Sequence, residues 1–169
     1  MASLAIVKEK ESGTMEVLLV SPVRPPVIIL AKLVPYLLVG MINIVVILLI
    51  SVFILNVPIA GNIFLLFLVG TIFTLSSLAL GIMVSVLTKT QRSAIIISIA
   101  GLMLPAITLS GFIFPLGSLS LLMKVIVHLM PVTLFISAAR NIMIKGLGMD
   151  AVYPELFGLI VITVVLIVI

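Results

Sequence analysis

The sequence lacks cysteine and tryptophan, and only 8% of its 169 residues are charged. Without cysteine, a disulfide framework and a thiolate metal site are excluded. There is one histidine, only two of the five acidic residues lie beyond position 16, and the common hydrolase, metalloprotease and phosphate-loop motifs do not occur. The sequence therefore predicts that the chain is not an enzyme, and any nucleotide chemistry is expected on another chain.

Hydrophobic residues make up 64% of the chain, and the mean hydropathy is +1.60. Soluble domains are about 45–50% apolar and about 25% charged. The net charge of +4 is spread over short polar stretches, without the basic stripe and interleaved aromatics that indicate nucleic-acid binding. We therefore predict an all-α, polytopic helical membrane protein, with a single transmembrane domain over residues 1–169.

Four apolar stretches are candidates for membrane spans, because a helix needs about 20 apolar residues to cross the bilayer. Gly101 and Pro105 are expected to bend the third of them. The fourth is shorter than a full span, and the first ten residues resemble the cut end of a helix, so we expect the chain to be part of a longer one. The predicted spans cover residues 33–55, 63–87, 94–109 and 156–169.

Residues 8–32 form the one stretch in which charges crowd together. Each charge would cost about 2.5–3.5 kcal/mol at the centre of a spanning helix, so this stretch is expected in water or among lipid headgroups. A short helix is predicted between Gly13 and the breaker Ser21-Pro22. The acids Glu9, Glu11 and Glu16 are suited to docking a soluble partner. The alternative is a solvated charge cluster that only fixes the topology.

The distribution of basic residues predicts the orientation. Residues 8–32 and the loop 88–93 hold six of the nine basic residues, whereas the turn 56–62 holds none. Basic loops lie preferentially on the cytoplasmic side, so we predict that 8–32 is cytoplasmic and that 110–155 is external.

Residues 110–155 are too apolar for an aqueous loop but form no uninterrupted span. Two short amphipathic helices meet at Pro131, which predicts a re-entrant or interfacial hairpin on the outer side.

In the second span, Ser77, Gly81 and Ser85 are small residues at helical spacing, which favours close helix packing. The hydroxyls of Thr71, Thr74 and Ser76 are an alternative sign of a substrate pathway.

Two blocks of residues are similar to ABC-2 type transporter permeases, the membrane subunits of bacterial ATP-binding-cassette exporters of the multidrug-efflux kind. The first block is Glu9-Lys10-Glu11-x-Gly13-Thr14-x-Glu16-x-Leu18-x-x-Ser21-Pro22-Val23-Arg24, followed by Lys32 and Pro35-Tyr36. The second is Leu109-Ser110-Gly111-Phe112-Ile113-Phe114-Pro115, followed by Pro131-x-Thr133-x-Phe135, Arg140 and Lys145-Gly146. The resemblance covers the family's pattern from the end of its second span onward.

The resemblance implies a coupling helix over Glu9 to Val20, seated in a groove of a partner ATPase. The implied docking residues are Glu9, Glu11, Gly13, Thr14, Glu16 and Leu18. A re-entrant hairpin over Ser110 to Lys145 would form an outer gate, with Gly111, Phe112, Phe114, Pro115, Pro131 and Arg140 as its implied residues.

The implied function is export of a hydrophobic or amphipathic substrate across the cell (inner) membrane by alternating access. The chain itself would hold no cofactor, because ATP and magnesium would bind to the ATPase subunit. A second permease subunit, identical or different, would complete the pathway.

Two other classes of function remain open. One is a non-transporting membrane scaffold or assembly subunit, and the other is an intramembrane enzyme, which the scarcity of ionisable residues in the spans disfavours.

Overall fold

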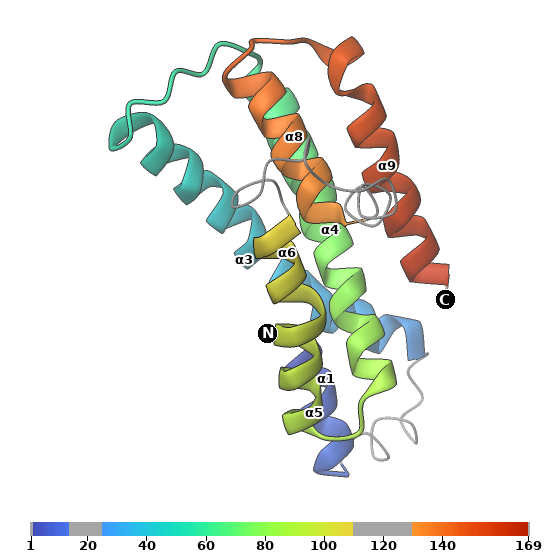
Figure 1. Ribbon diagram of the computed structural model, residues 1–169. Helices are drawn as coiled ribbons and strands as arrows, with labels where there is room; N and C mark the ends of the chain where they lie inside the picture. Colours follow the sequence, from blue (N-terminus) through green and yellow to red (C-terminus); the bar gives the residue numbers. More distant parts are fainter. Residues whose placement is uncertain (1, 14–24, 110–129, 169) are drawn as a thin grey trace.

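The computed structural model describes residues 2–13, 25–109 and 130–168, and every regular element in these ranges is helical. The prediction of an all-α polytopic membrane protein is confirmed. Figure 1 shows α4, α8 and α9 side by side and α3 running obliquely to them, with α1 and α5 at the end opposite the α3–α4 connection. The elements are α1 (Ala2–Glu11), α3 (Pro25–Phe53), α4 (Ile63–Leu87), α5 (Gln91–Ile97), the π-helical η1 (Ser98–Met103), α6 (Leu104–Leu109), α8 (Pro131–Met143) and α9 (Met149–Val168).

Four helical segments of the described residues are long and apolar enough to cross a membrane: Ala31–Phe53, Ile63–Leu87, Gln91–Thr108 and Met149–Ile167. The second has the predicted bounds. The last begins at Met149 rather than near Leu156, because the helix continues through Pro154 and carries Asp150 in its first turn, where an acid complements the positive helix end.

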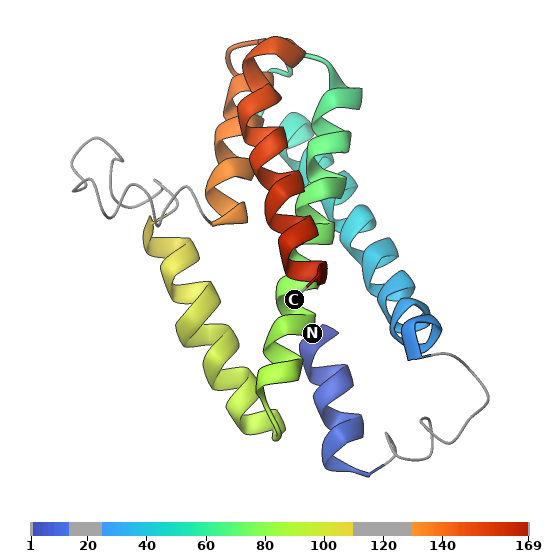
Figure 2. The same cartoon turned by 90° about the vertical axis from the view of Figure 1, so that its right-hand side faces the viewer.

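The third span contains a π-helical turn where a bend was expected. The N–H of Leu104 bonds to the carbonyl of Ile99, five residues earlier, and Gly101 lies inside this turn. Proline has no N–H, and its ring crowds the carbonyl four residues earlier, which here belongs to Gly101. Pro105 thus explains why the helix widens at this point. In Figure 2 the continuous helix formed by α5, η1 and α6 starts beside α4 and diverges from it toward α6.

The main hydrophobic core lies where α4, α8 and α9 meet. A smaller core joins α1 to the far end of α4 and to α5, through the buried residues Val7, Val84 and Ala94. The buried residues of the main core are Leu65, Leu66, Val69, Leu134, Ala138, Ile142, Val152, Leu156 and Leu159. Helix α4 therefore contributes to both cores and forms the centre of the bundle.

Helices α3 and α4 approach each other closely at Gly40 and Gly70, which are not the expected packing positions Ser77, Gly81 and Ser85. A Cβ placed on Gly40 would overlap Cγ2 of Thr74, and one on Gly70 would lie 2.9 Å from Cδ1 of Ile44. Of the residues expected to pack, Ser85 is buried but Ser77 is exposed. Glycine permits this spacing because it has no side chain to separate the two backbones.

Several hydroxyls inside the bundle are hydrogen-bonded. Ser76 and Thr163 lie 2.5 Å apart between α4 and α9, and both are buried. The hydroxyls of Thr71 and Thr74 donate to carbonyls of their own helix, those of Phe67 and Gly70. These contacts satisfy polar groups that hydrocarbon cannot solvate.

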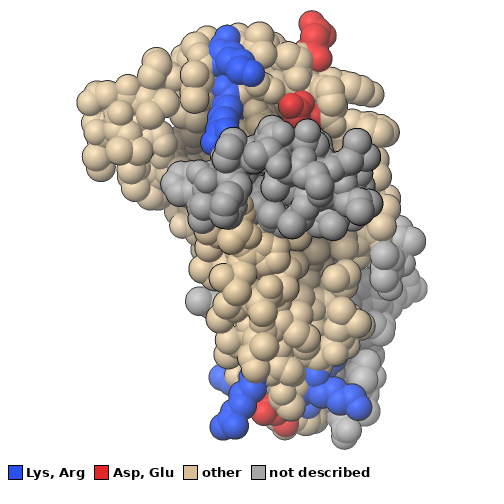
Figure 3. Space-filling model, viewed as in Figure 1, with Lys and Arg blue, Asp and Glu red and all other residues tan. Residues whose placement is uncertain are grey.

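Charged side chains gather at the two ends of the face shown in Figure 3, and the middle of that face shows none among the described residues. The described residues of this belt thus carry no charge, as a bilayer requires of a spanning surface.

Candidate functional site

Three of the six predicted docking residues are described, and these three lie in the last turn of α1 or just after it. Glu9 and Glu11 belong to its last turn, and Gly13 follows with a φ of 72°, in the left-handed region that favours glycine. Helix α1 ends at Glu11, so the coupling helix predicted over Glu9 to Val20 overlaps it only at its start. The rest of that segment, with the short helix predicted between Gly13 and Ser21-Pro22, lies largely outside the described residues. Thr14, Glu16 and Leu18 lie outside the described residues.

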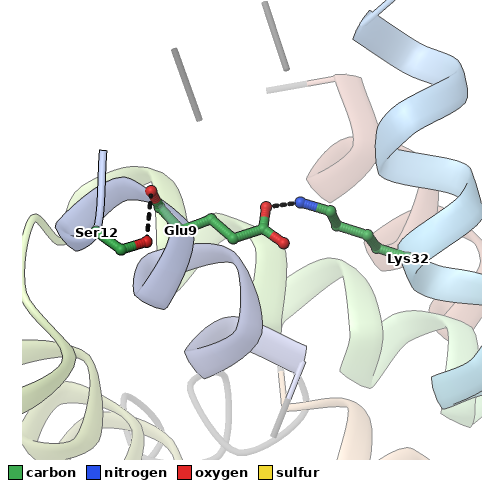
Figure 4. A network of polar contacts seen from close by, with 3 residues as sticks. All are labelled: Glu9, Ser12 and Lys32. Atoms are coloured by element: carbon green, nitrogen blue, oxygen red, sulfur yellow. Dashed lines mark hydrogen bonds and ion pairs between the residues drawn. The ribbon is translucent and has the colours of Figure 1, made fainter. Parts of the chain in front are cut away.

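Three consecutive charged residues at the end of α1 each contact a different helix; we call Glu9, Lys10 and Glu11 the α1 clasp. Glu9 forms an ion pair with Lys32 of α3, and Figure 4 shows the two side chains pointing toward each other from their separate helices. The Lys10 ammonium donates to the carbonyl of Ser85 on α4, at 2.6 Å. The clasp thereby ties α1 to α3 and α4.

Glu11 completes the clasp by binding the start of α5. One carboxylate oxygen accepts from the backbone N–H of Gln91 at 3.1 Å and from its side-chain amide at 2.9 Å. The first N–H groups of a helix have no partner within that helix, so the carboxylate acts as a cap contributed by a distant segment. The bond from the Gln91 backbone N–H, followed by that from the Gln91 side chain, holds the pKa of Glu11 below its ordinary value.

Of the predicted outer-gate residues, Pro131 and Arg140 are described, whereas Gly111, Phe112, Phe114 and Pro115 lie outside the described residues. Pro131 is the first residue of α8, where a missing N–H costs nothing, and it is buried. Arg140 is exposed in the last turn. Its carbonyl accepts from the N–H groups of Ile144 and Lys145.

Helix α8 packs into the bundle along the face that carries Leu134, Ala138 and Ile142. Thr133 is also buried. Near the other end of the helix, the Asn141 amide donates to a carboxylate oxygen of Glu155 on α9, at 3.2 Å. Helices α8 and α9 are thus joined by both apolar and polar contacts.

A groove of about 320 Å³ lies between α3, α4 and α8; we call it the central groove. Its polar side chains are Asn43 and Ser51 on α3 and Thr74 and Ser77 on α4. None of the described residues that line it is ionisable. The remaining lining residues are Gly40, Ile44, Ile47, Leu48, Leu66, Phe73, Phe135, Ala139 and Met143.

Two further hollows flank the central groove. One of about 230 Å³ lies between α4, the η1–α6 segment and the start of α8, and Ser77 lines both it and the central groove. The other, about 700 Å³, lies between α3, α4 and their connection, and all of its described lining residues are apolar. Among the described residues no group of three or more histidine, cysteine or acidic residues could hold a metal ion.

Asn43 and Ser51 belong to none of the motifs that predict the site. The available signal was that each is a polar residue within a span that is otherwise almost wholly apolar. Their spacing of eight residues, with Ile47 midway, places them on one face of a helix.

Comparison with known protein families matches residues 1–169 to the ABC-2 family transporter protein family. YbhS of Escherichia coli (strain K12), a probable multidrug ABC transporter permease, is 35% identical over 146 residues, which are 86% of this chain and 39% of the relative. YbhR of the same strain, also a probable multidrug ABC transporter permease, is 32% identical over 161 residues, 95% of this chain and 44% of the relative.

A eukaryotic relative is ABC transporter G family member 20 of Dictyostelium discoideum, 33% identical over 155 residues, which are 92% of this chain and 21% of the relative. The chain thus spans less than half the length of each of these relatives. No solved structure shows a significant match. Because the family match runs over all 169 residues, the chain belongs to the ABC-2 family of transporter proteins.

Proposed function

We propose that the chain is a membrane-spanning permease subunit of an ABC exporter, which moves a hydrophobic or amphipathic substrate across the cell membrane by alternating access. A separate ATPase subunit, which binds ATP and magnesium, drives the movement. Membership of the ABC-2 family supports the class of protein. The four apolar helices and the uncharged central groove suit a pathway for apolar molecules.

The observation that carries the proposal is the α1 clasp. It ties one helix end to α3 through Lys32, to α4 through Ser85 and to α5 through Gln91. Residues 8–32 lie on the cytoplasmic side in the proposed topology, so an ATPase seated against them pushes on α1. The clasp then passes that movement to three helices at once.

The proposed docking segment comprises Glu9, Glu11, Gly13, Thr14, Glu16 and Leu18. Since Glu9 and Glu11 contact other helices of the chain, their role is to position the docking segment, and Glu16 is the acid that meets the partner. On the outer side, the segment around Gly111, Phe112, Phe114, Pro115, Pro131 and Arg140 forms the gate. A second permease subunit, identical or different, completes the pathway.

The test is co-purification from detergent with the ATPase subunit encoded beside the gene. Glu16→Lys is the variant, and Asp150→Lys is the matched charge reversal, because Asp150 is exposed in the first turn of α9. We expect the native chain and Asp150→Lys to recover the ATPase and Glu16→Lys to lose it. Failure of the native chain to recover any ATPase would overturn the exporter function. Equal recovery with both variants would remove Glu16 from the docking site.

Transport separates the exporter from a membrane scaffold. Inside-out vesicles that contain the complex should accumulate a lipophilic dye when ATP is added, and should not do so when the ATPase subunit carries an inactivating substitution. Recovery of the ATPase together with ATP-independent dye uptake would favour the scaffold.

A further inference from the structure

The central groove holds polar side chains that lack the partners their position requires. Within the described part of the chain, the side chains of Asn43, Ser51 and Ser77 make no hydrogen bond, whereas the buried Ser76 and Thr163 bond to each other. Asn43 and Ser77 are also exposed. In hydrocarbon an unsatisfied amide or hydroxyl is costly, so these groups indicate that something with hydrogen-bonding atoms occupies the groove.

The groove offers hydrogen bonds from two facing helices. The Asn43 amide has two donors and an acceptor, and each serine hydroxyl can donate and accept. Thr74 adds an acceptor, because its hydroxyl proton already points to the carbonyl of Gly70. The occupant therefore needs hydroxyl, amide or carbonyl groups.

The rest of the groove is apolar and partly aromatic. The rings of Phe73 on α4 and Phe135 on α8 stack with centroids 4.5 Å apart, and both line the groove. This surface suits a flat apolar or aromatic group beside the polar one. A volume of about 320 Å³ is at the lower end of the range for drug-sized ligands, so one such molecule fits.

The described lining offers no counter-charge to an ionised ligand. No ionisable residue is among the described residues that line the central groove or its two neighbours. A lipophilic cation or anion would leave water without meeting a counter-charge, which is unfavourable in a low-dielectric site.

We propose that the central groove binds an uncharged aromatic amphiphile, with Asn43 as its principal hydrogen-bonding residue. This assignment rests on the exporter function proposed above and narrows its substrate class. Chloramphenicol, which is uncharged and carries hydroxyl and amide groups beside an aromatic ring, is a suitable probe. Tetraphenylphosphonium and taurocholate are the charged comparisons.

The first measurement is binding of radiolabelled chloramphenicol to the purified complex without ATP, so that it does not depend on transport. We expect saturable binding that Asn43→Leu weakens at least tenfold and Ser77→Ala weakens severalfold, with little competition from either charged compound. Thr108→Val is the matched control, because Thr108 bonds to Leu104 of its own helix and lines none of these hollows. It should stay within twofold of the native value.

Three results would overturn the assignment: no saturable chloramphenicol binding, equal affinity in Asn43→Leu, or stronger binding of the cation. A change of oligomeric state in Asn43→Leu would instead assign the amide to a contact between helices of two subunits. Leucine at this exposed position of the span should not impair folding, and the thermal unfolding of the variant checks this.

Transport then distinguishes this proposal from the wider one. ATP-driven uptake of tetraphenylphosphonium without uptake of chloramphenicol would keep the exporter and refute the uncharged substrate class. Absence of ATP-driven uptake of every compound, with chloramphenicol binding intact, would refute the exporter and keep the groove as a binding site.

Discussion

Gly61→Ala should separate the α3–α4 connection from the end of α8. A Cβ at Gly61 would lie 2.5 Å from the carbonyl oxygen of Ile142 and 3.0 Å from its Cγ2. The neighbouring Ala60 N–H donates to the carbonyl of Met143 at 3.0 Å, so the connection and α8 are already in direct contact. Ile142 is fully buried in the main core, and its backbone cannot recede without moving α8.

The expected cost follows from two opposing effects. Overpacking a closely packed site costs about 1–3 kcal/mol. Replacing glycine with alanine also stiffens the unfolded chain, which stabilises the folded state by roughly 0.4–1 kcal/mol where the backbone conformation suits alanine. The matched control is Gly148→Ala, because a Cβ there would meet nothing within 4 Å. Gly148→Ala should be neutral or slightly stabilising, and Gly61→Ala should be less stable than it by about 1–3 kcal/mol.

The assay is the free energy of unfolding of both variants, measured by denaturant titration in mixed detergent micelles. Hydrogen exchange at the Ala60 amide gives a second readout, since its bond to Met143 should weaken only in Gly61→Ala. Equal stability of the two variants, with unchanged exchange at Ala60, would refute the close approach of this connection to α8.

Two further predictions concern the polar contacts between helices. Ser76→Ala removes the 2.5 Å contact with Thr163. A double-mutant cycle with Thr163→Val should give a coupling energy of about 0.6–1.7 kcal/mol, as for other hydrogen bonds between membrane helices. If the effects of the two substitutions on the free energy of unfolding simply add, this hydrogen bond is contradicted. The pKa of the Glu11 carboxyl should lie below the ordinary value of about 4.3, as measured by NMR titration. Because the folded state favours the ionised carboxylate, Glu11 stabilises the fold fully above its ordinary pKa, and this contribution is lost as the pH falls through the lowered pKa of the folded state. An unshifted or raised pKa of Glu11 would contradict its role as a cap on α5.

The spans could be predicted closely where local chemistry marks both ends. The segment 63–87 begins after Asn62, whose side chain accepts from the N–H of Phe64, and ends before the polar residues that follow Leu87. The start of α9 was harder to place because Pro154 and two acidic residues resemble a loop. An acid in the first turn is favourable, and the apolar packing of Val152 and Leu156 on α4 and α8 stabilises the helix.

The contacts between helices could not be predicted because they depend on which faces meet. The small-residue spacing in α4 favoured Gly81, whereas the close approaches to α3 use Gly40 and Gly70. For the same reason the sequence could not show that the acids of α1 also contact other helices of the chain. Their contacts with Lys32 and Gln91 join residues that are far apart in the sequence.

The α1 clasp and the central groove involve the same two helices, which leads to a last prediction. Lys32, held by Glu9, is on the helix that carries Asn43, and Ser85, held by Lys10, is on the helix that carries Ser77. Glu9→Gln should therefore change the separation of α3 and α4 without altering any groove residue.

The native chain has no cysteine, so spin labels at Leu38→Cys and Leu75→Cys, both exposed positions, would report that separation alone. We expect Glu9→Gln to broaden or shift the distance distribution. Glu155→Gln, a matched acid replacement on α9, should leave it unchanged. If Glu9→Gln leaves the distribution as it is in the native chain, the clasp does not set the spacing of the groove walls. Movement of α1 would then have to reach the pathway through α5, whose first N–H is held by Glu11.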